Sequence, residues 1–361
     1  MSQFDHFVGT RPVSGQHVFD VPDLQVWLSH NLPGFAGPLT VELFKGGQSN
    51  PTYKLLTPSK NYVMRAKPGP VAKLLPSAHA IEREFTVMKG LAGTDVPVPQ
   101  MHVLCEDESI IGRAFYVMEC MDGRVLWDQS LPGMTTLQRG EIYDEMNRVI
   151  AALHSIDIEA QGLSAFGKPG NYIERQIGRW SKQFVASVTQ PIPEMDKLMA
   201  WLPEHIPASA KDTSLVGVVH GDYRLDNLMF HATEPRVIAV LDWELSTLGH
   251  PLADFSYHCM AWHISPGTFR GIGGLNHKAL GIPEEAEYIR RYCDRTGFTT
   301  PEILAKDWNF YLAYNMFRIA AILQGIAKRV EDGTASSDQA RASGAGARPM
   351  AELAWQFASK A

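Results

Sequence analysis

The chain has 361 residues, of which 45% are hydrophobic and 20% are charged, and this composition is ordinary for a globular protein. Its 33 basic and 39 acidic residues give a formal net charge of −6, which argues against nucleic acid or an anionic membrane surface as the main partner, because both require a basic excess. A chain of this length exceeds what one hydrophobic core usually serves, so two domains are expected.

The bulk features also predict a cytoplasmic protein without a membrane anchor. The first fifteen residues, MSQFDHFVGTRPVSG, lack the basic and apolar regions of a secretory signal. The most apolar long segment, residues 310–327, contains Asn315, Arg318 and Gln324, which is typical of a buried helix rather than a membrane span. The four cysteines lack the spacing of a zinc site, and free thiols in a reducing compartment are expected.

The first part of the chain is predicted to form a strand-rich lobe. A helical candidate at residues 23–32 precedes residues 39–68, where alternating apolar positions and glycine-containing turns predict three strands. Apolar residues at helical spacing predict one main helix over residues 78–92. Residues 101–123 then predict two more strands joined by an acidic turn.

After Gly123 the helical period dominates. Residues 135–157 begin with a possible capping box formed by Thr135 and Gln138. Further helices are expected at residues 171–189, 194–202, 283–296 and 301–330. Residues 331–349, rich in small and polar side chains, predict a mobile linker before a last amphipathic helix. The expected domains are therefore residues 1–120, a nucleotide-binding lobe, and residues 121–361, a helical lobe with the catalytic loop and acceptor site.

The segment VVHGDYRLDNLMF, residues 218–230, places polar groups between two apolar runs. Kinase catalytic loops have this arrangement, with an Asp as base and an Asn five residues later as magnesium ligand. Asp222 and Asn227 have that spacing, and the following run VIAVLDWE brings Asp242 to the position of the second magnesium-binding acid. We therefore expect these three residues to be catalytic, with Asn227 and Asp242 as metal ligands. His220 is expected to be structural.

Segments upstream of this motif supply candidate residues for binding ATP. The turn FKGGQSNPTY lies between two predicted strands, where glycines let backbone amides approach phosphate groups. The candidates in this turn are Gly46, Gly47, Ser49 and Asn50. Arg65 ends the next strand and Glu84 lies on the following helix, so the two would form the cation–glutamate pair that holds ATP phosphates, although Glu82 competes for the same role.

Taken in order, these motifs resemble the aminoglycoside phosphotransferase and choline kinase-like family of small-molecule kinases. The resemblance rests on GGQSNPTYKL, YVMRAKP, FYVMECMDG, HGDYRLDN and LDWELSTLGHPLADF. It implies an α+β, protein-kinase-like fold of two lobes, with an N-terminal antiparallel sheet and a larger, mostly helical C-terminal lobe. The segment GIPEEAEYIRRYCDRTG and the helix after it resemble a narrower branch, in which the kinase-like domain is fused to or associated with acyl-CoA dehydrogenases.

The resemblance also implies the cofactors and further roles. ATP and Mg²⁺ would be bound, with the backbone of Glu119 and Met121 meeting adenine. Arg65 stands where protein kinases have Lys, and many members of the family carry Arg there. Asp254, in HPLADF, would support the catalytic loop.

The sequence carries fewer signals for the acceptor than for the nucleotide. Residues 256–281 contain three His, one Lys and one Arg but no acid, which suits an anionic acceptor. CoA thioesters carry phosphates, and the narrower branch implies a 4-hydroxyacyl-CoA and a functional link to an acyl-CoA dehydrogenase. An aminoglycoside or choline kinase and a catalytically inactive binding module stay open as alternatives. So does a metal-dependent phosphohydrolase that uses His220, Asp222, Asp242, His250 and His258.

Overall fold

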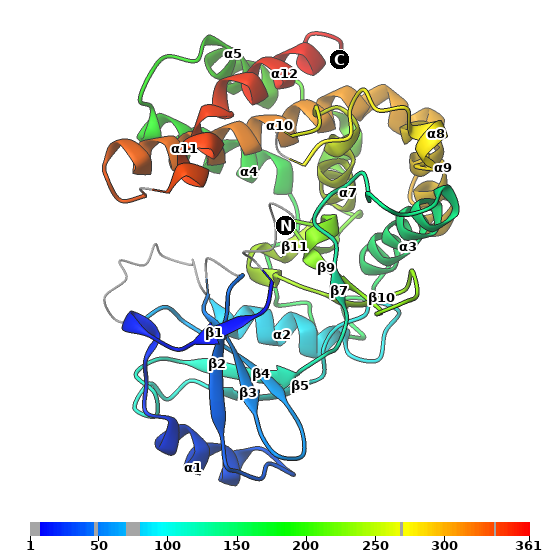
Figure 1. Cartoon of the computed structure of the whole chain (residues 1–361). Coiled ribbons are helices and arrows are strands. Elements are labelled where there is room, and N and C mark those ends of the chain that lie inside the picture. Colours follow the sequence, from blue (N-terminus) through cyan, green and yellow to red (C-terminus); the bar gives the residue numbers. More distant parts are fainter. Residues whose placement is uncertain (1–7, 47–49, 70–79, 268–269, 336) are drawn as a thin grey trace. The chain divides into compact units, whose positions relative to one another are not determined.

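The computed structural model describes residues 8–46, 50–69, 80–267, 270–335 and 337–361 (Figure 1). The chain forms two compact units. The first contains the described parts of residues 1–127 together with 160–166 and 228–246, and the second contains residues 128–159, 167–227 and the described parts of 247–361. The units differ from the expected domains 1–120 and 121–361 chiefly in segment 228–246, which carries Asp242 and packs within the first unit.

The first unit is built on a six-stranded antiparallel sheet. The alternating apolar pattern predicted five of these strands, and the short strand at residues 10–12 was not predicted. The strand order is β1-β2-β3-β4-β6-β5. The strands are β1 (Thr10–Pro12), β2 (Thr40–Phe44), β3 (Thr52–Leu56), β4 (Tyr62–Ala66), β5 (Met101–Cys105) and β6 (Phe115–Glu119). Helices α1 (Val21–Asn31) and α2 (Ile81–Leu91) pack against the sheet.

Successive residues of β6 show how the two helices cover the sheet. Side chains alternate between the two faces of a strand, so neighbours in sequence point in opposite directions. The Phe115 ring contacts Trp27 of α1, with centroids 5.1 Å apart, whereas the next residue, Tyr116, contacts Phe85 of α2. Arg65 of β4 lies directly opposite Tyr116 in the register and therefore shares the α2 face.

A small second sheet completes the first unit. It has the order β10-β9-β7, formed by β7 (Arg124–Val125), β9 (Leu228–Phe230) and β10 (Val237–Val240). The amide of Val240 donates to the Pro97 carbonyl at 2.9 Å, and the Arg83 guanidinium donates to the carbonyl of Ser246 at 3.2 Å. These bonds hold the segment after β10, which contains Asp242, against α2 and the loop that follows it.

The second unit is mostly helical, with one two-stranded sheet formed by β8 (Gly217–Val219) and β11 (Thr247–Gly249). Its helices are α3 (Thr136–His154), α4 (Tyr172–Ser187), α5 (Pro193–Glu204), α6 (Ala208–Lys211), α7 (Pro251–Cys259), α8 (His277–Leu280), α9 (Glu285–Thr296), α10 (Pro301–Glu331), α11 (Asp338–Ala345) and α12 (Ala347–Ala358). The capping box predicted at the start of α3 is present. Within the described ranges, none of the helices combines the length and hydropathy that a membrane crossing requires.

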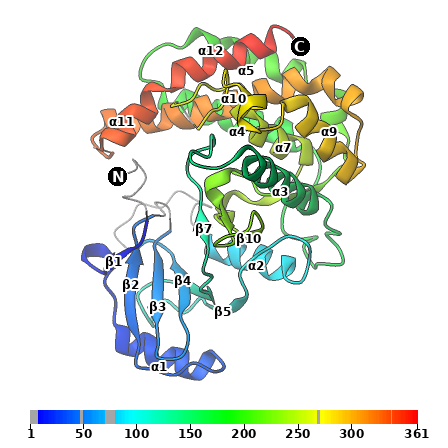
Figure 2. The ribbon, with the colours of Figure 1, turned by 45° about the vertical axis from the view of Figure 1, so that its right-hand side comes forward.

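Helix α10 is the central element of the second unit. It packs against α4, α11 and α12, as Figure 2 shows. It also holds α7, because the buried Asn315 amide donates to the Ala253 carbonyl at 2.9 Å and to the Ser256 hydroxyl at 2.8 Å. Asn315, a polar residue in this apolar helix, is therefore a partner of a neighbouring helix.

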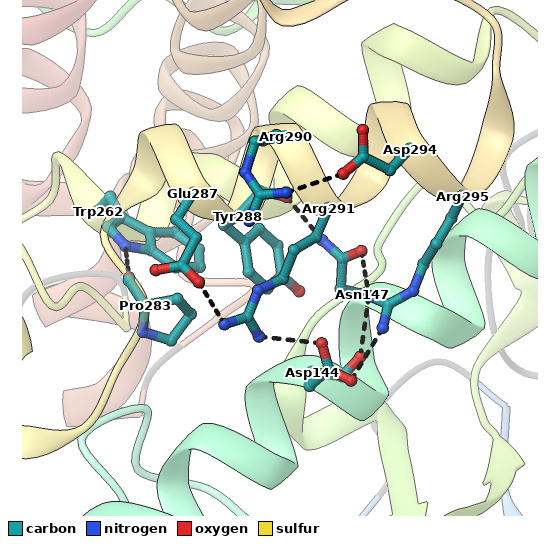
Figure 3. Close-up of polar contacts among 10 residues, drawn as sticks. All are labelled: Asp144, Asn147, Trp262, Pro283, Glu287, Tyr288, Arg290, Arg291, Asp294 and Arg295. Atoms are coloured by element: carbon teal, nitrogen blue, oxygen red, sulfur yellow. Dashed lines mark hydrogen bonds and ion pairs between the residues drawn. The ribbon is translucent and has the colours of Figure 1, made fainter.

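Charged side chains join α3 to α9 (Figure 3). Asp144 of α3 accepts from Arg291 at 2.9 Å and from Arg295 at 2.8 Å. The Asn147 amide donates to the Tyr288 carbonyl at 2.9 Å. These contacts fix α9 on α3 and thereby fix the ring of Tyr288, which reaches the interior of the unit.

The predicted mobile linker at residues 331–349 is wrong for most of its length, because α10 extends to residue 331, residues 338–345 form α11 and α12 begins at residue 347. Ser337 caps this helix by accepting from the Ala340 amide at 3.1 Å. A side chain at Gly344 would meet the backbone of Ala327 at 2.8 Å, so the small residues let α11 approach α10 closely. The composition that suggested a linker instead permits tight helix packing.

Candidate functional site

The loop that carries Asp222 follows β8 and is fixed through its backbone. Gly221 has a φ of +82°, in the left-handed region that glycine adopts without strain. The amides of His220 and Gly221 donate to the two carboxylate oxygens of Asp254 at 2.7 and 2.9 Å, and the Asp222 amide donates to His220 Nδ1 at 3.2 Å. These contacts agree with a supporting role for Asp254 and a structural role for His220.

Asp254 is a buried carboxylate with several partners. Burial by itself raises the pKa of a carboxyl group, but hydrogen bonds and charge from His154, together with the bond from the His220 amide, hold the pKa of Asp254 below its ordinary value. His154 Nε2 lies 3.2 Å from Asp254 Oδ2, and His154 Nδ1 lies 2.7 Å from the Tyr292 hydroxyl. The loop therefore rests on a carboxylate that stays ionised.

The Asp222 carboxylate is held by three side chains. Its Oδ2 lies 3.0 Å from the Asn227 amide nitrogen and 3.1 Å from an Arg224 guanidinium nitrogen, and its Oδ1 accepts from the Tyr257 hydroxyl. Asn227 can reach back because residues 225–227 form a tight 3₁₀ turn. With 17% of its side chain exposed, Asp222 stays accessible to a small molecule.

In the first unit, Arg65 and three acids form a second polar cluster. The Arg65 guanidinium lies 3.0 Å from Glu84, 2.8 Å from Asp242 and 3.8 Å from Glu244. Burial favours the neutral form of this guanidinium, but the neighbouring carboxylates, Glu84 foremost, raise the pKa of Arg65 above its ordinary value. Arg65 is therefore a permanent buried cation between β4, α2 and the segment after β10.

Glu84 is the best-buried acid of this cluster, at 1% exposure. The Asn50 amide donates to one of its oxygens at 2.8 Å, and the Tyr116 hydroxyl donates to the other at 3.0 Å. Burial raises the pKa of Glu84 despite the opposing effect of Arg65. Its competitor Glu82 instead pairs with Lys67 on a more exposed face of α2. The structure thus selects Glu84 as the partner of Arg65.

Asp242 has an unusual backbone conformation. Its φ of 63° and ψ of 62° lie in the left-handed region, which only a small fraction of non-glycine residues adopt. The next residue, Trp243, is buried and donates its indole NH to the Val240 carbonyl at 2.9 Å, which anchors the turn. Such strain is concentrated at functional sites, and here it directs the Asp242 carboxylate toward Arg65.

The remaining predicted residues lie outside these contacts. Gly47 and Ser49 fall outside the described residues. Gly46 is partly exposed and lies two residues after the end of β2. Glu119 ends β6, where its amide donates to the Gln100 carbonyl at 2.9 Å, and Met121 follows in the connection to β7. Their proposed contacts with phosphate and adenine stay predictions.

The structure brings the other predicted residues together in two groups. Arg65, Glu84, Asn50 and Asp242 form one group within the first unit, and Asp222 and Asn227 form the other within the second unit. Three contributors were not predicted from the sequence: Tyr116, Arg224 and Tyr257. Arg224 lies within the HGDYRLDN motif itself, so its closeness to Asp222 was the one available signal.

An open pocket lies beside Asp222 in the second unit. Two of its lining residues, Arg224 and Tyr257, also contact the Asp222 carboxylate. Further lining residues are Met260, Ala261, Ile264 and Arg270. The pocket therefore combines apolar walls with two guanidinium groups.

Most cations that suggested an anionic acceptor have other partners. His263 pairs with Glu285, Arg291 with Asp144 and Glu287, and Lys328 with Asp332. Arg270 does line the pocket, where it lies 2.8 Å from Asp226, and Arg224 contacts the same acid at 3.5 Å. The expected basic lining is thus reduced, among the described residues, to these two arginines and the neutral His258.

His258 is a buried imidazole between the loop that carries Asp222 and α9. Its Nε2 lies 2.7 Å from the Tyr288 hydroxyl, and it also bonds to the backbone of Tyr223. Burial lowers the pKa of His258 to about 4, so the ring is neutral near pH 7. Protonation would place an uncompensated charge at this position.

We expect His258 to make the protein less stable in acid. Because the unfolded chain takes up this proton near pH 6.5 and the folded protein only near pH 4, stability falls as the pH is lowered across this window, by about 3 kcal/mol. Urea unfolding of wild type and His258→Gln at pH 7 and pH 4 measures this term. The unfolding free energy of the variant should fall less between pH 7 and pH 4 than that of wild type. An equal fall in the two proteins would contradict the lowered pKa of His258.

The histidines considered for a hydrolase metal site are engaged with protein groups. His250 Nε2 lies 2.8 Å from the Ser209 carbonyl, His258 binds Tyr288, and His220 accepts from the Asp222 amide. These contacts favour structural roles for all three rings.

Known proteins resemble this chain over nearly its whole length. A profile of the family described as the phosphotransferase enzyme family matches residues 40–306. The chain is 48% identical to mouse acyl-CoA dehydrogenase family member 10 and 42% identical to rat acyl-CoA dehydrogenase family member 11, over 97% of its own length in both cases. It spans only 32% and 45% of those relatives.

Several solved structures share the fold of this chain. A Ralstonia eutropha protein, provisionally named an aminoglycoside phosphotransferase, is 64% identical, with a TM-score of 0.87 over 95% of this chain and 99% of that one. Choline kinase from Cryptosporidium parvum is 14% identical, with a TM-score of 0.63 over 94% and 96%. Aminoglycoside phosphotransferase APH(4)-Ia in complex with ADP and hygromycin B is 15% identical, with a TM-score of 0.58 over 92% and 97%. The predicted kinase-like α+β fold, with an antiparallel sheet and a helical lobe, is confirmed.

Proposed function

The chain belongs to the phosphotransferase enzyme family, and we propose that it transfers the γ-phosphoryl group of ATP to a hydroxyl group of a small molecule. The observation that carries this proposal is the Asp222 carboxylate, which is contacted by three side chains, lies on a loop held by Asp254 and borders a pocket. A carboxylate in this setting suits the base of a phosphoryl transfer, in which positioning accounts for most of the catalysis.

In this mechanism the acceptor hydroxyl lies against Asp222. Its proton passes to the carboxylate while its oxygen forms a bond to the γ-phosphorus, and the bond between that phosphorus and the bridging oxygen of ADP breaks. The Asp222 carboxylate is suited to take the proton because its remaining bonds hold it in place without making it inaccessible.

On the nucleotide side, Arg65 would contact the ATP phosphates and Glu84 would hold Arg65. Gly46, Gly47 and Ser49 would approach the phosphates through backbone amides, and the backbone of Glu119 and Met121 would meet adenine. Asn50 supports the pair through its bond to Glu84. The choice of ATP is supported by family membership and by the ADP in the APH(4)-Ia complex, whose fold is similar.

Asn227 and Asp242 would hold the magnesium ion. Both residue types present the oxygen atoms that Mg²⁺ prefers, and the amide nitrogen of Asn227 is committed to Asp222, so its amide oxygen is the atom for a metal. Asp242 keeps 32% of its side chain exposed despite its bond to Arg65. When bound, magnesium would neutralise phosphate charge.

We propose a hydroxyacyl-CoA, of the 4-hydroxyacyl type, as the acceptor. Two features support this choice: the pocket joins Met260, Ala261 and Ile264 to the guanidinium groups of Arg224 and Arg270, and the relatives at 48% and 42% identity are named acyl-CoA dehydrogenases. A functional link to such a dehydrogenase is part of the proposal.

A mass-spectrometric assay with Mg-ATP tests the proposal. The acceptors are 4-hydroxyacyl-CoA, 3-hydroxyacyl-CoA, choline and kanamycin, with the Asp222→Asn variant as control. We expect a hydroxyacyl-CoA product heavier by one phosphoryl group, formed by wild type and strongly reduced in the control. Transfer only to choline or kanamycin would overturn the acceptor, and ATP binding without transfer to any of them would favour an inactive binding module.

A further inference from the structure

Helix α7 contacts the catalytic loop at two points. Asp254 accepts from the loop amides of His220 and Gly221, and Tyr257, three residues later, donates to the Asp222 side chain. Residues three apart on a helix share a face, so one face of α7 fixes both the backbone of the loop and its catalytic carboxylate. The first contact belongs to the loop support already described, whereas the second has no assigned role.

Tyr257 is suited to act as a fixed donor. Its side chain is buried, and its ring lies 5.0 Å from the guanidinium carbon of Arg318, which also donates to the Gly221 carbonyl. Burial, followed by the charge of Asp222, raises the pKa of Tyr257 well above its ordinary value. The phenol therefore keeps its proton throughout the range in which enzymes work.

The Asp222 carboxylate needs such a donor. The terminal torsion of an aspartate is broad, so a bond to one oxygen alone leaves the plane of the group poorly defined. Arg224 and Asn227 both contact Oδ2, and Tyr257 contacts Oδ1. Together they hold both oxygens.

We propose that Tyr257 is a positioning residue that sets the orientation of the Asp222 carboxylate for accepting the acceptor's proton. This inference rests on the proposed phosphoryl transfer. Tyr257 exchanges no proton in the reaction: the acceptor proton goes to Asp222, the new oxygen–phosphorus bond forms, and ADP leaves. Because Tyr257 also lines the pocket, the orienting group and the space for the acceptor are adjacent.

Tyr257→Phe should lower kcat by about 10- to 100-fold, the range for losing one hydrogen bond to a charged group. The KM for ATP should not change, because no nucleotide contact is removed. The mass-spectrometric transfer assay measures kcat under saturating ATP, and the same assay at varied ATP concentrations measures the KM.

A double-variant cycle separates positioning from a general structural role. If Tyr257 acts through Asp222, then Tyr257→Phe should not lower turnover further once Asp222 is already replaced by Asn. A structural defect would instead lower the turnover of both backgrounds by the same factor.

Tyr311→Phe is the matched control. It removes the hydroxyl of another buried tyrosine in the same unit, whose partner Ser209 lies outside the Asp222 contacts, and it should leave turnover unchanged. If Tyr257→Phe keeps wild-type kcat, or if its effect is additive with Asp222→Asn, the positioning role is wrong while the kinase function stands. If wild type transfers phosphate to no acceptor and does not hydrolyse ATP, the proposed function falls and the inference falls with it.

Discussion

Asp222→Asn should lower turnover by about 10² to 10⁴, the usual range for losing general-base assistance. Asparagine has the same shape: its amide oxygen can still accept from Arg224, and its NH₂ group can donate to the hydroxyl oxygen of Tyr257, so the loop should keep its conformation. It cannot accept the proton of the acceptor hydroxyl. ATP binding should change far less than turnover, because Asp222 contacts groups of the second unit and serves the acceptor rather than the nucleotide.

Steady-state transfer rates and ATP titrations on the same preparations measure these two effects. Asp294→Asn is the matched control, since it makes the same chemical change at an exposed acid of α9 that pairs with Arg290. It should leave turnover at the wild-type level. Near-normal turnover in Asp222→Asn would show that another group takes the proton, and a parallel loss of ATP binding would point to a general disruption instead.

The residues of this site were predictable where chemistry and spacing coincide within one segment. Asp222 and Asn227 lie in one short motif, and their contact follows from the tight turn between them. The pairing of Arg65 with Glu84 followed from the order of strand and helix, but the choice over Glu82 did not. It depends on which face of α2 meets β4 and β6, and that face is set by packing.

Contacts between distant segments were not predictable. Tyr257 could not be assigned from the sequence, because its three-residue spacing from Asp254 has meaning only once α7 is known to be a helix facing the loop. The basic character of residues 256–281 was overestimated for the same reason. The acids that pair with these side chains, such as Glu285 with His263, lie outside residues 256–281.

Arg65→Met should destabilise the protein by about 3–5 kcal/mol, the usual consequence of removing one partner from a buried ion pair. Glu84 is almost fully buried and would keep only the bonds from Asn50 and Tyr116, and Asp242 would lose its 2.8 Å contact. Urea unfolding at constant pH measures the loss, and an ATP titration should show weakened binding. The stability and the ATP affinity of Arg65→Lys should lie between those of wild type and those of Arg65→Met. A lysine keeps the positive charge, but a single ammonium group cannot contact Glu84 and Asp242 with the forked geometry of a guanidinium.

The double variant Arg65→Met/Glu84→Gln distinguishes the structural role of Arg65 from its role toward the nucleotide. Neutralising the buried carboxylate removes the uncompensated charge, and a glutamine can still accept from the Asn50 amide with its oxygen and donate to the Tyr116 hydroxyl oxygen with its NH₂ group. Stability should therefore return toward that of wild type, whereas ATP binding should stay weak because no cation faces the phosphates. A double variant no more stable than Arg65→Met would mean that the Arg65–Glu84 pair is not the source of the instability. Restored ATP binding would mean that Arg65 holds the fold of the first unit without contacting the nucleotide.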